Sequence, residues 1–254
     1  MIYDAEEFNR LRKVVISISL TSWLVILFKP VTSSCCAAVT TAWLLDLRCN
    51  LNLLGSLASD WVLMLLAMMG PTLVPAIYHV RISSFARRRL RSTVLFIGSY
   101  GVIWLAAGAI LLSAQRCSMW LEPQSNLPAI SVGVVALLWQ VSPIKQRCLN
   151  RCHSHRPLAA FGFGADRDVI HMGFEHGLWC AGSCWAAMLF PLLLSQGHLL
   201  TMAAITVLMF CERLDPPKAP SWRWRGFHTA FCYIRLRLRD VYSVRPRFAF
   251  TTQA

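Results

Sequence analysis

The chain has 254 residues, of which 56% are hydrophobic and 15% are charged, and its formal net charge is +13. A soluble domain is usually about a quarter charged. Here the charges lie between long apolar runs, which excludes an ordinary soluble protein and predicts an all-α, polytopic helical membrane bundle. No nucleic-acid-binding motif accompanies the lysines and arginines, so the expected partner is the lipid bilayer and no nucleic acid.

Six apolar runs predict six transmembrane helices. They cover residues 14–28, 61–78, 93–114, 127–141, 171–194 and 198–211. The first is expected to be an uncleaved signal anchor rather than a signal peptide, because no clear cleavage site follows it. A further apolar piece, residues 35–47, is too short to span and is expected to be re-entrant, interfacial or part of a broken first span.

Arginine-rich segments follow alternate runs. If the N-terminus lies in the cytoplasm, residues 81–91, 143–157 and the tail all fall on that side, as the positive-inside rule requires. The sequence therefore predicts a multi-pass protein of the cell (inner or plasma) membrane with both termini cytoplasmic. Its expected parts are a signal-anchor region (1–57), a metal-binding-like membrane domain (58–214) and a basic aromatic tail (215–254). The tail is expected to lie on the membrane surface or to be partly disordered.

The fifth run carries a sulfur or imidazole side chain every four residues. These are Met172, His176, Cys180, Cys184 and Met188. Residues four apart stack on one side of a helix, and soft transition metals prefer these side chains. The two ends of this ladder cannot face one ion, because such positions drift by about 40° per step. The alternative is that the cysteines are ordinary buried packing residues.

A ladder of small residues, Gly173, Gly177 and Ala181, runs beside the first one. Small residues at this spacing let another helix approach closely. They support an alternative function, a non-catalytic membrane assembly or interaction protein with structural cysteines. Under that alternative, the small-residue face would bind a membrane protein partner and the thiols would not matter.

Other candidate ligands lie elsewhere in the chain. Met68 and Met69 offer thioethers, which bind Cu(I), although methionine also fills gaps in apolar cores. At the end of the fourth run, Cys148, Cys152 and His153 could hold Zn(II) or Cu(I), or could be incidental thiols of a reduced loop.

Cysteines in the predicted external segments, Cys35, Cys36, Cys49 and Cys117, could form disulfides. Enzyme signatures such as GxSxG, a Walker loop, GxGxxG and HExxH are absent from the sequence, which predicts that the protein is not an enzyme. A membrane thiol-redox role for Cys180 and Cys184 is the alternative. It is disfavoured because redox pairs prefer the CxxC spacing.

Several motifs in order make the chain resemble a bacterial family described as predicted metal-binding integral membrane proteins (domain of unknown function 2182). They are Ala67-Met68-Met69-Gly70-Pro71, then Gln140, Pro143, Lys145, Cys148, Leu149 and Cys152, then Gly177, Cys180, Gly182, Cys184 and Trp185, and finally Glu212-Arg213-Leu214. The resemblance covers about residues 58–214. One departure is Ser183, which stands where that family usually has a cysteine.

The residues and the resemblance together predict an integral membrane protein that binds a soft metal ion, most favourably Cu(I), for transport or delivery. Cys180 and Cys184 are the expected core ligands, with Met68, Met69 or His176 completing the site. A cytoplasmic capture or release site is expected at residues 148–153.

Overall fold

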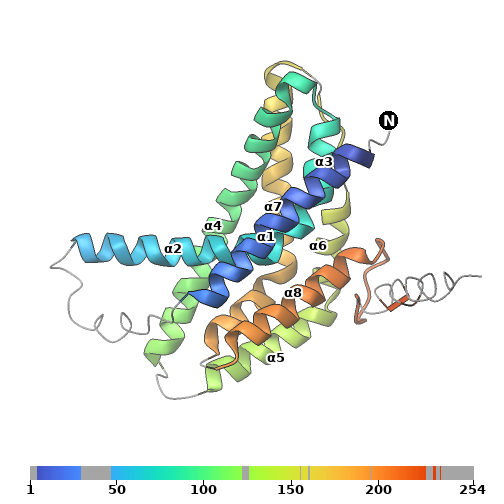
Figure 1. Cartoon of the computed structure of the whole chain (residues 1–254). Helices are drawn as coiled ribbons and strands as arrows, with labels where there is room; N and C mark the ends of the chain where they lie inside the picture. Colours follow the sequence, from blue (N-terminus) through green and yellow to red (C-terminus); the bar gives the residue numbers. More distant parts are fainter. Residues whose placement is uncertain are drawn as a thin grey trace, which may run out of the picture.

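The structure is a computed structural model that describes residues 5–29, 47–121, 126–154, 156–159, 161–194, 196–226, 231–232 and 235, without the side chains of 47–54 and 119–121. All regular elements in these residues are helices (Figure 1), so the predicted all-α fold is confirmed. They are α1 (Ala5–Phe28), α2 (Leu47–Met69), η2 (Gly70–Leu73), α3 (Val74–Ile82), η3 (Ala86–Arg88), α4 (Arg89–Leu121), α5 (Leu127–Val141), α6 (Pro143–His153), α7 (Gly162–Leu193) and α8 (His198–Leu214).

Four helical segments are long and apolar enough to cross a membrane: Ala5–Phe28, Gly55–Ile82, Ala86–Ser118 and Gly162–Leu193. A fifth arises if α5 and α6, which meet at a 61° bend, form one broken span. A helix perpendicular to the bilayer needs about 20 residues to cross it, and α8 has 17. The predicted count of six spans is therefore not confirmed.

The helices extend beyond the predicted runs. Helix α2 already begins at Leu47, so the last part of the predicted external loop is helical, and α7 begins nine residues before His171. The apolar piece at 35–47 lies almost wholly outside the described residues, as do Cys35 and Cys36. Cys117 is exposed and has no disulfide bond.

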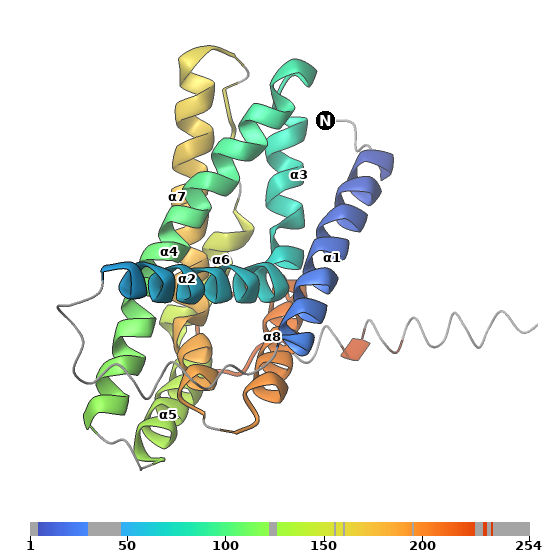
Figure 2. The ribbon, with the colours of Figure 1, turned by 60° about the vertical axis from the view of Figure 1, so that its left-hand side comes forward.

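Helices α4 and α7 are the longest in the described chain and lie side by side through the bundle (Figures 1 and 2). They approach closely where α7 has no side chains. A Cβ on Gly173 would lie 1.9 Å from Ser99 Oγ and 2.7 Å from the Phe96 backbone oxygen, and one on Gly177 would lie 3.0 Å from Ile103 Cβ. The predicted small-residue packing face therefore exists, and α4 of the same chain covers it.

A substitution of Gly173 by alanine should destabilise the fold, because the backbone of α4 would have to move. Overpacking of this kind costs about 1–3 kcal/mol, and we expect a lower thermal unfolding midpoint in detergent. Gly98→Ala is the matched control, because no described atom lies within 4 Å of its added Cβ and alanine favours helix by up to about 1 kcal/mol. Equal midpoints for the two variants would contradict this packing.

The chain bends between α2 and α3 because of Pro71. Proline has no N–H to donate, so the carbonyl of Ala67, four residues earlier, loses its helical partner. Helix α1 satisfies it, since Ser19 Oγ donates a 2.7 Å hydrogen bond and Trp23 Nε1 a 3.2 Å hydrogen bond to Ala67 O. Thus the break that ends α2 at Met69 is also the point where α1 docks.

The chain bends again between α5 and α6, where Ser142 accepts a hydrogen bond from the Lys145 backbone N–H at 3.2 Å. The described start of the tail then packs on α6. Gln146 Nε2 donates to the backbone oxygens of Ser221 (2.6 Å) and Arg223 (2.8 Å), and Arg225 Nη1 donates to Asn150. Residues 215–226 are therefore an ordered extension of the bundle, which neither sequence-based expectation for the tail included.

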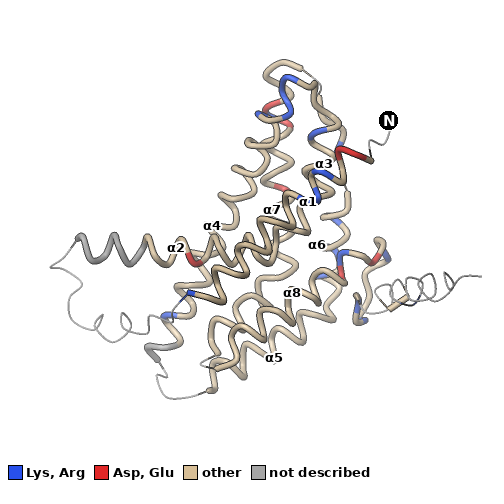
Figure 3. The backbone as a smooth tube through the Cα atoms, in the orientation of Figure 1, with Lys and Arg blue, Asp and Glu red and all other residues tan. Residues whose placement is uncertain are grey.

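Basic side chains gather at the end of the bundle where α3 ends and where α4 and α7 begin (Figure 3). Two largely buried carboxylates, those of Glu7 and Asp166, form ion pairs with several of these basic residues. Glu7 pairs with Arg81 at 3.0 Å and with Arg89 at 2.7 Å. Asp166 on α7 pairs with Arg88 at the end of η3 and with Arg91 on α4. These ion pairs tie α1, α3, α4 and α7 together at the basic end.

A sulfur-rich candidate metal centre

Seven of the nine methionines in the sequence lie in one buried core with three cysteines. Its sulfur-bearing members are Met64, Met68, Met69, Met172, Met188, Met202, Met209, Cys152, Cys180 and Cys184. They come from α2, α6, α7 and α8, so helices from both halves of the chain contribute. Thiols and thioethers are soft ligands, and such a core suits a soft metal ion better than a hard one.

Cys180 lies at the centre of this sulfur cluster, with no exposed surface. Its Sγ is 4.0 Å from Met69 Sδ. The hydroxyl of Tyr100 on α4 donates to the same sulfur at 3.4 Å, and Arg213 Nη2 on α8 does so at 3.2 Å. Met69 is in place because α2 ends there, at the break before Pro71. The predicted pairing of Cys180 with Met69 is thus geometrically present.

Cys184 lies one helical turn further along α7 and is also buried. Its thiol donates a 3.0 Å hydrogen bond to the Cys180 backbone oxygen, and the two cysteine side chains interact with each other. Ser183 Oγ donates to the same carbonyl at 2.7 Å. The serine that replaces the expected cysteine therefore binds its own helix. Cys180 contacts both Met69 and Cys184, and these three residues are called the sulfur triad below.

Arg213 supplies the positive charge at this triad. Besides Cys180 it contacts Cys152 of α6, so its guanidinium lies between two thiols on different helices. A neighbouring cation stabilises a thiolate, which is the form of cysteine that binds metals. Arg213 belongs to the Glu212-Arg213-Leu214 motif. Its contact with Cys180 could not be predicted from the sequence, because the two residues are 33 positions apart and lie on different helices.

A buried ion pair holds the end of α8 that carries Arg213. Lys145 Nζ and Glu212 Oε1 are 2.7 Å apart, and both side chains are 2% exposed. Gln140 joins them, donating to Glu212 and accepting from Lys145. The network links α5, α6 and α8, so two motifs separated by more than sixty residues meet inside the bundle. Removing one partner would leave an uncompensated buried charge.

Three other predicted ligands, Met68, His176 and Cys148, are also buried. Met68 is buried in the same core, and His176, one turn before Cys180, packs its ring 6.0 Å from the rings of Tyr100 and Phe96. Cys148 lies against Gly182, where an added Cβ would be 3.2 Å from its sulfur.

His153 is the predicted ligand that is most clearly engaged elsewhere. Its Nδ1 lies 2.9 Å from the Leu149 backbone oxygen and its Nε2 lies 3.1 Å from the Arg213 backbone oxygen. In the part of the chain that the structure describes, no three His, Cys, Asp or Glu side chains cluster as a metal site. His153 is therefore held by backbone oxygens, while Cys148 and Cys152 lie near each other on α6, and the capture site predicted at residues 148–153 stays a prediction.

These observations define a helical bundle with apolar helices of membrane-spanning length around a buried thiol–thioether cluster. Residues 58–235 match the family model described as PpoB2: Copper chaperone. Because this match covers more than half of the chain, the protein belongs to that copper chaperone family. No curated protein and no solved structure matches it. The match supports the copper-related character predicted from the residues and the resemblance together, whereas the family name given with the resemblance is not confirmed.

Proposed function

We propose that the protein binds Cu(I) inside its helical bundle and holds it for transport or delivery, as a non-catalytic carrier. The observation that carries this proposal is the 4.0 Å approach of Cys180 Sγ to Met69 Sδ, with both side chains buried. Membership in the copper chaperone family supports copper as the ion. The ligands are the sulfurs of Cys180, Cys184 and Met69.

The charge of the site favours a monovalent ion. Two thiolates and one Cu(I) together carry one negative charge, which the guanidinium of Arg213 balances. A divalent ion bound by the same ligands would leave a net positive charge in the apolar core, where uncompensated charge is costly. Zinc is further disfavoured because structural Zn(II) sites take four ligands of the N, O or S type.

The alternative role as an assembly protein lacks a specific structural observation in its favour. The small-residue face of α7 that would bind a partner is covered by α4.

We also propose that the bundle lies in the cell membrane with its basic end on the cytoplasmic side. The arginines at the ends of α3 and η3 support this orientation, since positive charge is retained on that side.

The proposal is tested by titrating the purified full chain with Cu(I), without oxygen, against a chromophoric Cu(I) chelator. The wild type should take up stoichiometric Cu(I). Met69→Leu should weaken binding by at least about tenfold, since even outer-shell changes cost 10–100-fold in metal affinity. Leucine replaces methionine at nearly constant volume, so the fold should persist.

Met209→Leu provides the matched control, because Met209 is buried in the same core but comes from the middle of α8. Its Cu(I) affinity should equal that of the wild type. A wild-type chain that takes up no Cu(I) would end the proposal, and equal affinities for the two methionine variants would remove Met69 as a ligand.

A further inference from the structure

A small cavity of about 30 Å³ opens between α6 and α7, beside His176. This volume is enough for one water molecule or one ion. Its rim includes Glu175, whose side chain is 34% exposed and pairs with Arg156 at 3.2 Å. Its inner wall includes Met172 and His176, which are 6% and 8% exposed. The cavity thus runs from an ion-paired rim to a buried wall of soft ligands.

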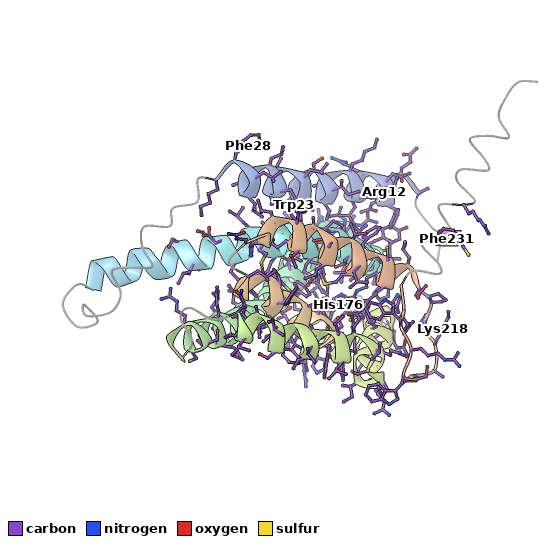
Figure 4. All side chains as sticks on the ribbon, turned by 90° about the horizontal axis from the view of Figure 1, so that it is seen from below. Arg12, Trp23, Phe28, His176, Lys218 and Phe231 are labelled. Carbon is purple, nitrogen blue, oxygen red and sulfur yellow. The ribbon has the colours of Figure 1, made fainter. Side chains whose placement is uncertain are left out.

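His176 connects this cavity to the candidate metal centre. In Figure 4 it lies within the bundle, and its side chain is buried. Its ring packs against Tyr100, whose hydroxyl donates to Cys180 Sγ. Met172, His176 and Cys180 follow one another by one helical turn, about 6 Å per step. They therefore form a stepwise line of soft ligands on one side of α7.

We propose that Met172 and His176 form a transit site through which Cu(I) passes between the cavity and Cys180. This inference rests on the proposed function. An imidazole nitrogen and a thioether sulfur are neutral ligands, so they hold Cu(I) less strongly than thiolates do and release it readily. At each step one bond from copper to a ligand breaks as another forms, and the protons that the Cys180 and Cys184 thiols release are taken up by the donor thiolates that gave up the copper. Copper stays Cu(I), and neither an oxidant nor a reductant is needed.

The rim of the cavity suits copper carried by thiolates rather than a bare ion. Arg151 and Arg156 border it, and the guanidinium of Arg151 lies 5.5 Å from the centre of the Trp179 ring. Because Glu175 pairs with Arg156, the rim keeps one net positive charge, that of Arg151, which repels a free cation and attracts an anion. A Cu(I) complex of two thiolates has a net negative charge, so it would be drawn to this rim before ligand exchange.

The test compares the rate at which the protein takes up Cu(I) with the final amount of copper that it binds. Cu(I) is presented to the full chain in detergent as its anionic dithiothreitol complex, and transfer is followed by stopped-flow absorbance of the copper–thiolate bond. His176→Ala and Met172→Leu should each slow loading by about tenfold or more, a loss of about 1.4 kcal/mol of barrier lowering. The final copper content and the affinity should stay as in the wild type. The rate at which a chelator removes the bound copper should fall by the same factor as the rate of loading.

His198→Ala is the control, because His198 lies at the start of α8 and contacts the Pro191 backbone oxygen at 2.7 Å. It should load at the wild-type rate. Wild-type rates in both α7 variants would overturn the transit site. A loss of final copper in His176→Ala would also overturn it, by making His176 a resident ligand. Failure of the proposed function is distinct, since the wild type itself would then take up no copper.

Discussion

Cys180→Ser should leave the purified protein without copper when cells are grown with copper and the metal is measured by mass spectrometry. A hydroxyl is a poor ligand for Cu(I), and Cys180 is the thiol that both Met69 and Arg213 contact. The substitution is nearly isosteric, so the helical content and the elution volume should not change. The loss should therefore report the ligand and not the fold.

Cys117→Ser is the matched control for this change. Cys117 lies on α4 and its side chain is exposed, whereas Cys180 and Cys184 are buried. Its variant should keep the wild-type copper content. Equal copper in the Cys180 and Cys117 variants would mean that bound copper is held elsewhere in the chain.

Lys145→Met should produce the largest loss of stability. It leaves the carboxylate of Glu212 buried at 2% exposure without its cation, and breaking a buried ion pair in this way costs about 3–5 kcal/mol. We expect a markedly lower thermal unfolding midpoint in detergent. Copper binding should also weaken, because Glu212 precedes Arg213 and their helical turn is held by this network.

The double variant Lys145→Met/Glu212→Met distinguishes a charge effect from a packing effect. With both charges removed, the stability should recover most of the loss, since apolar replacements of a buried pair are often neutral. If the double variant is as unstable as the single one, the ion pair is not the reason for the destabilisation.

The sequence predicted the parts of the centre that one helix determines. Cys180 and Cys184 lie a turn apart on α7, so helical periodicity alone places them together, and the same geometry separates Met172 from Met188. Close packing at Gly173 and Gly177 was predicted for the same reason. The adjoining helix could not be identified, because a small-residue pattern specifies close approach and not the partner.

The contacts between different helices could not be predicted from the periodicity of one helix. Tyr100 and Arg213 reach Cys180 only because α4 and α8 pack on α7, and neither side chain is a metal ligand that a motif search would select. His153 shows the converse. It stands beside Cys152 in the sequence, but its ring nitrogens face backbone oxygens of Leu149 and Arg213. Spacing gives proximity along a chain, whereas orientation depends on the packing.

The number of membrane spans could not be predicted from the hydropathy pattern alone. A mostly apolar helix of 15 or 17 residues, such as α5 or α8, is equally compatible with a short span and with a helix buried inside the bundle. The pair α5–α6 shows why, since its 61° bend at Ser142 joins an apolar helix to a basic one. The helix lengths and this bend leave four spans, or five if α5 and α6 form one broken span.

The central claim is that Cu(I) is held by sulfur at the Cys180–Cys184–Met69 triad. X-ray absorption at the copper edge of the Cu(I)-loaded full chain tests it most directly. The predicted spectrum is that of Cu(I) surrounded by sulfur, with loss of the sulfur shell in Cys180→Ser. A shell of nitrogen or oxygen atoms that is the same in the wild type and in the Cys180 variant would contradict the claim.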